Sequence, residues 1–506
     1  MKPTIKHSLK LLCAMLAFVT LGMSQPVPAQ SAPPDVSKEL AVVKRHMDTA
    51  QLKSALAFVE EQIADPSDVI QDWIGVCNAL GPSHDEIFRA RQIYKMFRIY
   101  GLEEVYIDDL YNVVAVRRGT GKGPSVVLNA HHDNVPIWPK EQPVNAFVRD
   151  GRVYCPAAGD DIPGVVQLFT VLRAMQTANL QTEGDVWFVT FSGEETGSPG
   201  ALHFARAHYP HNLDWKRGDA FVQLHGGAGE GVTTGSGPIV NRATLRFFTP
   251  FERRVAESPG ADRRWRTHAV DVLARALVRI RTEVTDPRPD CLRCVGPGEG
   301  AAGRAKTPTR AEHYVNISQI DGSPVVNRPT SEAAVRIDMR APTWPAVRKL
   351  HEQIRKIAAE SCEELKTKGF PPHFNKERCG FIFDINEVYG RDPVNDKIPG
   401  WDMVNNPQAK YVAAAASALY GFPPVINSGQ GCGDCTNLYQ GGLPGMSFRG
   451  EVTDYGKGKF EQETPDDARQ GGHDVTESMS TVAIWAGIKH ALVFAVSYAG
   501  QPGVAR

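Results

Sequence analysis

The stretch Ser125-Val-Val-Leu-Asn-Ala-His-His-Asp133 decides the fold of this chain. Its apolar, β-branched residues follow Gly121-Lys-Gly-Pro124 and predict a buried strand that ends in a polar cluster. His131 at the carboxyl end of such a strand is well placed to bind a metal ion. Asp133 can accept a hydrogen bond from the other ring nitrogen and so orient the imidazole. A single His-x-Asp is more often a hydrogen-bonded loop histidine, so a metal site requires ligands elsewhere in the chain.

The composition limits the kind of protein that this chain can be. Its 506 residues are enough for roughly two or three domains. The formal net charge is -1 and the sequence has no long basic stripe, which argues against a nucleic acid as partner.

The first residues have the pattern of a secretory signal peptide. Lysines between residues 2 and 10 precede the apolar stretch Leu11–Met23, which is short for a membrane span, and Val27-Pro-Ala29 supplies small residues before a cleavage point. We therefore expect residues 1–29 to be a signal peptide and the mature protein to be periplasmic or secreted, with no stable membrane anchor. An uncleaved anchor is the alternative.

The sequence contains nine cysteines, one of them in the signal-peptide region. An exported chain permits disulfides. We expect local disulfides at Cys291-x-x-Cys294 and Cys432-x-x-Cys435, and Cys362–Cys379 as a further pair. The alternative is a zinc ribbon made by the two Cys-x-x-Cys motifs, although they lie farther apart than the usual ligand spacing.

Short apolar strands alternate with helices in the first half of the chain. Ser83-x-x-Glu86 has the pattern of a capping box at the start of a helix that ends at Gly101. A second helix is predicted at residues 162–175, and strands are predicted at residues 112–116, 125–130, 186–191 and 221–224. This alternation predicts an α/β domain with a mainly parallel central sheet, whose site lies at the strand ends.

The pattern changes after about residue 240. Strands are predicted at residues 243–248 and 333–338, and helices at residues 269–280 and 346–356. A Pro/Gly-rich loop at residues 285–308 lies between the first helix and the second strand. From residue 407 the α/β pattern returns. We therefore expect a first domain made of residues 30–240 and 401–506, and a smaller α+β domain, residues 241–400, inserted in it.

Further polar clusters follow predicted strands or open a predicted helix. They are Asp160-Asp161, Glu194-Glu195, His225, and His473 in Gly471-Gly-His-Asp474. Each alone has a simpler explanation as a helix cap, a solvated loop or a surface turn. Together with His131 they supply the mixed nitrogen and oxygen ligands that zinc accepts.

In order and approximate spacing, these clusters resemble the motifs of the co-catalytic di-zinc hydrolases that include peptidase T, carboxypeptidase G, succinyl-diaminopimelate desuccinylase and the aminoacylases, in the zinc exopeptidase superfamily. The resemblance covers nearly the whole mature chain. It implies a zinc-exopeptidase catalytic domain with a smaller lid domain. The matching stretches are Leu128–Pro136, Ala158–Gly164, Phe191–Gly197, Leu224–Gly227 and Gly433–Asn437, together with His473.

The resemblance also implies which residues bind metal. His131 and His225 would bind one ion, Glu195 and His473 would bind the other, and Asp160 would bridge both. The expected cofactor is about two Zn²⁺ per chain, and Co²⁺ or Mn²⁺ would also suit these ligands.

Two further acidic residues are implied to be catalytic. Asp133 would orient His131, and Glu194 would be the general base. Neighbouring side chains in an extended segment point to opposite sides, so Glu195 can bind metal while Glu194 faces the attacking water. Glu194 would take the proton of this water and return it to the leaving amine of the amide bond.

His225 departs from the peptidase-like members, which have Asp or Glu at this position, and resembles the β-ureidopropionase and carbamoylase branch. We expect an exported zinc metallopeptidase, of aminopeptidase or carboxypeptidase type, that hydrolyses small peptides. The alternative is an N-acyl or N-carbamoyl amino acid amidohydrolase. A non-catalytic peptide or metal binder is a further alternative, against which the presence of Glu194 argues.

The middle region resembles the lid of this family, which is often a dimerisation domain. Asn327 and Arg340 match its Asn-containing turn and Asp-x-Arg strand, so they could contact a substrate carboxylate or the tetrahedral intermediate. The alternative is a turn asparagine and an arginine that pairs with Asp338. The lid histidine of many members is missing from Glu257–Ala261, and His268 is not a clear replacement. This absence weakens the inference of a homodimer.

Overall fold

The computed structural model describes most of the chain after residue 34. The described residues are 35–135, 145–206, 219–224, 231–234, 239–248, 269–284, 314–322, 330–341, 344–367, 379–389, 407–421, 426–427, 433–440, 443, 445–449, 469–470 and 477–505. The predicted signal peptide, Cys291, Cys294 and Cys432 lie outside them. No helix within these ranges has the length and hydrophobicity needed to cross a membrane.

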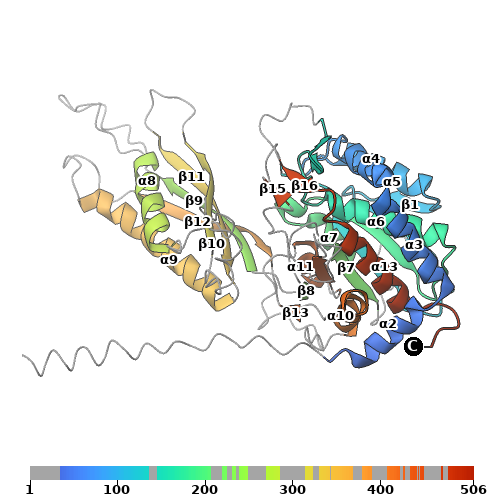
Figure 1. Ribbon diagram of the computed structural model, residues 1–506. Helices are drawn as coiled ribbons and strands as arrows, with labels where there is room; N and C mark the ends of the chain where they lie inside the picture. Colours follow the sequence, from blue (N-terminus) through green and yellow to red (C-terminus); the bar gives the residue numbers. More distant parts are fainter. Residues whose placement is uncertain are drawn as a thin grey trace, which may run out of the picture. The chain divides into compact units, whose positions relative to one another are not determined.

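The centre of the fold is an eight-stranded sheet in the order β1-β2-β6-β3-β7-β14-β8-β13 (Figure 1). Its central strands β6, β3, β7 and β14 are parallel to one another, whereas β1 and β2 pair antiparallel at one edge. This sheet confirms the predicted α/β class. The strands are β1 (Glu104–Ile107), β2 (Val113–Arg117), β3 (Val126–His131), β6 (Val186–Phe191), β7 (Ala220–Leu224), β8 (Gly231–Thr234), β13 (Ile426–Asn427) and β14 (Gly445–Arg449).

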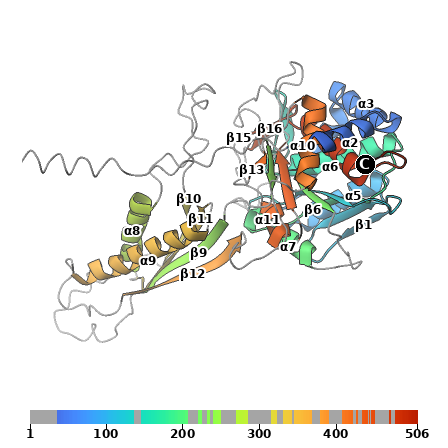
Figure 2. The ribbon, with the colours of Figure 1, turned by 90° about the horizontal axis from the view of Figure 1, so that it is seen from below.

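Helices cover both faces of this sheet, as Figure 2 shows. Successive residues of β3 point to opposite faces, so Leu128 joins one hydrophobic core and Val127 the other. The first core is closed by α2 (Ser37–Met47), α3 (Ala50–Ala64), α4 (Ser67–Cys77), α5 (Ile87–Ile99), α6 (Ile162–Thr177), α10 (Pro407–Tyr420) and α13 (Trp485–Ala499). The second is closed by α7 (Pro199–Arg206) and α11 (Gly433–Gln440).

A separate four-stranded antiparallel sheet, in the order β10-β11-β9-β12, has a core of its own. Burial alternates along β11, so one face is covered, and helices α8 and α9 supply the cover. This is the predicted smaller α+β unit. Its elements are β9 (Ile239–Phe248), α8 (Ala269–Arg279), η3 (Ile280–Val284), β10 (Tyr314–Asp321), β11 (Glu332–Ala341), α9 (Trp344–Thr367) and β12 (Gly380–Tyr389).

The described disulfides confirm one predicted pair and add another. Cys362–Cys379 links α9 to the residue before β12, as expected. Cys77–Cys155 joins residues 78 positions apart, a pairing that the sequence spacing does not indicate. Cys435 is also disulfide-bonded, so it is not a thiolate ligand of a zinc ribbon.

A third, small antiparallel sheet joins two strands that follow β3 in the sequence to two strands from the last 40 residues of the chain. Its order is β15-β16-β5-β4, with β4 at Phe147–Arg149, β5 at Arg152–Tyr154, β15 at Arg469–Gln470 and β16 at Ser478–Ser480.

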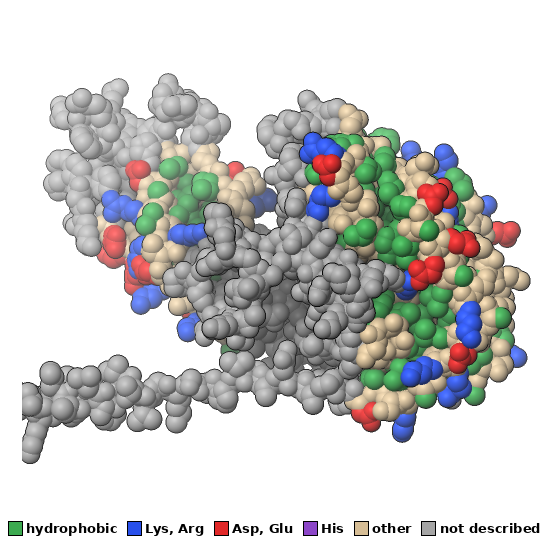
Figure 3. Space-filling model, in the orientation of Figure 1, with side chains coloured by type: hydrophobic (Ala, Val, Ile, Leu, Met, Phe, Trp, Pro, Cys, Tyr) green, Lys and Arg blue, Asp and Glu red, His purple; other side chains and the backbone are tan. Residues whose placement is uncertain are grey.

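Over the described residues seen in Figure 3, acidic and basic side chains are interspersed. This face agrees with the near-zero net charge of the sequence.

Candidate functional site

The site lies where two parallel strands end. His131 is the last residue of β3 and pairs in register with Phe191, the last residue of β6. The chain after β6 turns through Gly193 in a left-handed conformation into the short 3-10 helix η1 (Glu194–Thr196). Because parallel strands have their carboxyl ends at the same edge, the sheet brings His131 to the Glu194-Glu195 pair.

The imidazole of His131 is fully buried between two carboxylates. Its Nδ1 lies 3.1 Å from Asp133 Oδ1, and its Nε2 lies 2.9 Å from Asp160 Oδ1. Burial alone would lower the pKa of His131, but the carboxylates of Glu194, Asp133 and Asp160 raise it well above its usual value. The ring is therefore fixed at both nitrogens.

Asp133 connects this histidine to the Glu194-Glu195 segment. Its Oδ1 accepts a hydrogen bond from the backbone N–H of Glu194 at 3.1 Å, and its Oδ2 accepts from Glu195 N at 3.2 Å. Ser83 Oγ donates to the same Oδ2 at 2.7 Å. Burial would raise the pKa of Asp133, but its hydrogen bond and ion pair with His131, together with the Ser83 hydroxyl, lower it. A single ionised carboxylate thus orders the loops after β3 and β6.

Asp160 precedes α6 and is joined to Asp161 by a cis peptide bond. Asp161 is the N-cap of α6, and its side chain accepts a hydrogen bond from Gly164 N. The same side chain accepts from the backbone N–H of His131 at 3.3 Å. The acidic pair therefore serves both as the helix cap that such pairs usually form and as a neighbour of the histidine.

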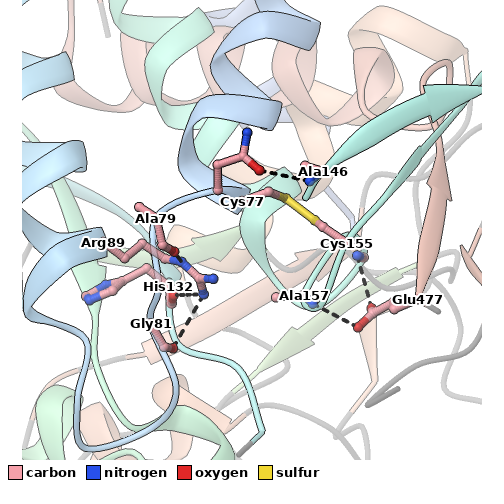
Figure 4. The surroundings of a disulfide bond; sticks show 11 residues. Cys77, Ala79, Gly81, Arg89, His132, Ala146, Cys155, Ala157 and Glu477 are labelled. Atoms are coloured by element: carbon pink, nitrogen blue, oxygen red, sulfur yellow. Dashed lines mark hydrogen bonds between the residues drawn. A yellow bond between two sulfur atoms is a disulfide. The ribbon is translucent and has the colours of Figure 1, made fainter. Parts of the chain in front are cut away.

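The loop before Asp160 is held at two further points (Figure 4). The buried carboxylate of Glu477 accepts hydrogen bonds from Ala157 N at 3.1 Å and from Gly159 N at 3.0 Å. The disulfide between Cys77 and Cys155 attaches the start of the loop to the end of α4.

Glu194 is packed against the first residue of α11. A Cβ on Gly433 would lie 1.6 Å from Glu194 Oε1, so the carboxylate occupies space that only glycine leaves open. Burial raises the pKa of Glu194 to about 7, and the neighbouring carboxylates add to this effect, whereas His131 opposes it. A carboxylate with such a pKa can both accept and donate a proton near neutral pH. Glu194 and the adjacent Glu195 are both partly exposed to solvent.

Sequence reasoning assigned no role to Asp434, although the matching stretch Gly433–Asn437 contains it. Asp434 is fully buried in the first turn of α11, and its Oδ2 accepts a hydrogen bond from Gln223 Nε2 at 3.1 Å. Burial, and next the charge of Glu194, raise its pKa well above its usual value. Asn437 Nδ2 donates to the carbonyls of Gly197 and Ser198, which fixes the end of the Glu194 loop.

The donor set of this site fits a divalent metal. Several largely buried carboxylates surround one imidazole, and bound cations would balance their negative charge. Imidazole nitrogen and carboxylate oxygen are ligands that zinc accepts. Within the described part of the chain, no three His, Cys, Asp or Glu side chains are arranged to hold an ion by themselves. The predicted ligands His225 and His473 lie outside the described residues.

Of the two predicted substrate-binding residues, Arg340 lies in the described part of the chain. Arg340 in β11 donates from Nε and Nη2 to Asp338 Oδ2, at 3.2 and 3.0 Å. This is the ion pair that the sequence left open as the alternative to substrate binding. Asn327 lies outside the described residues.

Comparisons with known proteins show the family to which the chain belongs. The model of peptidase family M20/M25/M40 matches residues 127–469. A protein of Pyrococcus furiosus named as a LysW-lysine/LysW-ornithine hydrolase is 27% identical over 172 residues, which cover 34% of this chain and 44% of that relative. The chain therefore matches less than half the length of this curated relative.

Solved structures share the fold at low sequence identity. The di-peptidase Dug1p of Saccharomyces cerevisiae is 11% identical with a TM-score of 0.61, covering 89% of this chain and 99% of its own. A tripeptidase of Staphylococcus aureus is 16% identical with a TM-score of 0.56, covering 86% and 99%. The chain belongs to peptidase family M20/M25/M40, a family of metal-dependent hydrolases of C–N amide bonds.

Proposed function

We propose that this protein is an exported, zinc-dependent hydrolase of the peptide bonds of small peptides, with Glu194 as general base. The observation that carries this proposal is the environment of His131, whose ring nitrogens lie 3.1 Å from Asp133 and 2.9 Å from Asp160. The Glu194 carboxylate, with its pKa raised to about 7, interacts with the same ring. Membership of the peptidase family supports a hydrolase with this site.

Each side chain has a part in this chemistry. His131, Asp160 and Glu195, with His225 and His473, would hold the zinc, which supplies activation of water and stabilisation of developing negative charge. Asp133 accepts the Nδ1 hydrogen of His131 and would thereby direct Nε2 to the metal. Nε2 and Asp160 Oδ1, the two atoms that would bind the same ion, lie 2.9 Å apart.

Glu194 performs the proton transfers. In its ionised form it takes a proton from the water that attacks the amide carbonyl. The protonated carboxyl then donates that proton to the leaving amine. Burial raises the pKa of Glu194 above its usual value, which favours the protonated form that donates to the leaving amine.

A second candidate activity is hydrolysis of N-acyl or N-carbamoyl amino acids. His225, in place of the Asp or Glu of peptidase-like members, favours it. Assays on dipeptides, tripeptides, N-acetyl amino acids and N-carbamoyl amino acids separate the two activities. Faster turnover of the free peptides supports the peptidase proposal, and cleavage of the carbamoyl substrates alone contradicts it.

The decisive test combines metal analysis with a variant of the base. The purified protein should hold about two zinc ions per chain, and less than one after loading would exclude a two-metal site. Glu194→Gln should keep the zinc and lose turnover by at least about 100-fold, the usual contribution of a general base. Glu103→Gln, at an exposed position, is the control. If Glu194→Gln retains turnover, Glu194 is not the general base.

Export is supported by the basic and apolar pattern of the first residues and by the disulfides, which persist in oxidising compartments. Amino-terminal sequencing of the protein expressed with its full sequence should show cleavage after residue 29. A full-length protein in the membrane fraction would instead indicate an uncleaved anchor.

A further inference from the structure

Three buried side chains before and within α5 reach the site from outside it. Ser83, Glu86 and Arg89 are 7%, 1% and 0% exposed. The predicted capping box is wrong: α5 begins at Ile87, its N-cap is Glu86, and no side chain caps it. Both polar residues of the Ser83-x-x-Glu86 pattern are instead bonded to the loops of the site. We call Ser83, Glu86 and Arg89 the brace.

Ser83 is bonded to the loop after β3. Its hydroxyl donates to Asp133 Oδ2 at 2.7 Å, and its backbone N–H donates to the carbonyl of Asn134 at 3.0 Å. In return, Asn134 N donates to the carbonyl of Gly81 at 3.0 Å. This bridge aligns the segment before α5 with the segment that carries the carboxylate partner of His131.

Glu86 is bonded to the turn after β6. Its Oε1 accepts hydrogen bonds from Gly193 N at 3.0 Å and from His84 N at 2.9 Å. Gly193 has a positive φ of 67° and directly precedes the proposed base Glu194. Glu86 therefore holds the residue at which the chain turns into the base.

Arg89 is bonded to the backbone beside His131 (Figure 4). Its Nη1 donates to the carbonyl of His132 at 2.7 Å, and its Nε donates to the carbonyl of Ala79 at 2.9 Å. A Cβ on Gly81 would lie 2.8 Å from Arg89 Nε, so the loop packs directly on the guanidinium. The brace thus contacts both loops that carry described site residues after β3 and β6.

We propose that the brace positions the hydrolytic site: Ser83 and Glu86 set the relative placement of Asp133 and the Gly193-Glu194 turn, and Arg89 fixes the backbone between His131 and Asp133. The inference rests on the proposed function and deepens it. None of the brace residues touches the reacting atoms, so each acts through a neighbour. Outer hydrogen bonds of this kind commonly affect metal affinity and activity about 10- to 100-fold when removed.

The test compares Ser83→Ala, Glu86→Ala and Glu86→Gln with the wild type. The readouts are zinc affinity by competition with a chelator, kcat and KM separately on the best peptide substrate, and circular dichroism. Ser83→Ala and Glu86→Ala should weaken zinc binding and lower kcat by about 10-fold or more, with KM within about two-fold. Glu86→Gln should restore wild-type values, because its amide oxygen accepts the same two hydrogen bonds.

Ser67→Ala is the matched control. Ser67 Oγ also donates to an aspartate, Asp65 Oδ1, at 2.7 Å, but this pair is exposed at the start of α4. The control should leave zinc affinity and kcat unchanged. It separates the effect of the brace from the general effect of removing a serine hydroxyl that bonds a carboxylate.

The outcomes are distinct. If the Ser83→Ala and Glu86→Ala proteins fold and have the zinc affinity and kcat of the wild type, the proposed positioning role of the brace is wrong. If Glu86→Ala does not fold, Ser83→Ala decides alone by the same criterion. A defect in Glu86→Gln as large as in Glu86→Ala also overturns it, since charge rather than hydrogen bonding would then matter. If the wild-type protein binds zinc but hydrolyses no amide substrate, the proposed function fails. The zinc affinities of the variants relative to the wild type then still test the brace.

Discussion

The carboxylate of Glu194 stands where a side chain of residue 433 would be, because a Cβ on Gly433 would come within 1.6 Å of Glu194 Oε1. The two residues lie far apart in the sequence and meet because α11 begins beside the turn after β6. The proposed base thus has a place only as long as residue 433 has no side chain.

Gly433→Ala should remove activity without unfolding the protein. The flexible side chain of Glu194 has to move away, and displacement of a general base costs at least about 100-fold in kcat. Gly380→Ala is the control, because a Cβ at that position meets no atom within 4 Å. Steady-state kinetics with circular dichroism measure both. A kcat of Gly433→Ala within a few-fold of the wild type would show that Glu194 is not the base in this position.

Asp133→Asn should weaken zinc binding by about 10- to 100-fold. An amide presents N–H groups where the carboxylate accepts hydrogen bonds from His131, Glu194 and Glu195. Asp72→Asn is a matched control: it is a buried aspartate that accepts from Tyr100, with no hydrogen bond to the site. Chelator competition should find a changed zinc affinity only in Asp133→Asn, and equal affinities would contradict the role of Asp133.

The sequence predicted the strands of the central sheet better than the surroundings of the site. The continuous apolar run at residues 186–191 became β6 with the same bounds, because a strand buried on both faces needs no other pattern. The Ser83-x-x-Glu86 pattern failed because a local motif cannot show that tertiary partners, Asp133 and Gly193, take both side chains. Helix α13 was not predicted, since it is buried all round and lacks the amphipathic period.

Site prediction was limited in the same way. His131, Asp133 and Asp160 are brought together as their positions at strand and helix ends implied. Asp434 had no assigned role because its neighbours Glu194 and Gln223 come from distant parts of the chain. Only the packing of α11 against η1 and β7 shows that this carboxylate belongs to the site.

Loss of the Cys77–Cys155 disulfide should affect both stability and the metal. The bond closes a loop of 78 residues, for which chain entropy gives about 4.5 kcal/mol, and it holds the loop that leads to Asp160. The Cys77→Ser/Cys155→Ser protein should therefore unfold at lower denaturant concentration and bind zinc more weakly. The control Cys362→Ser/Cys379→Ser, in the other sheet's core, should lose about 3 kcal/mol and keep its zinc affinity. Equal zinc affinity in the two double variants would contradict the link to Asp160.

His490 should make the protein less stable in acid. It is buried in α13, its Nε2–H donates to the carbonyl of Val412 at 2.7 Å, and burial lowers its pKa to about 4 from a usual value of 6.5. Between these values the unfolded chain binds a proton that the folded chain does not, so unfolding is favoured as the pH falls. The stabilisation is fully present above pH 6.5 and is lost towards pH 4, on the order of 3 kcal/mol.

The measurement is urea unfolding of the wild type and His490→Gln at pH 7.0 and 4.5, at constant zinc content. The glutamine amide can still donate to Val412 but does not titrate. Because other groups affect both proteins equally, the difference between their losses of unfolding free energy isolates His490. The wild type should lose more than the variant by an amount on the order of 3 kcal/mol. If both lose the same, His490 is not held neutral by its burial.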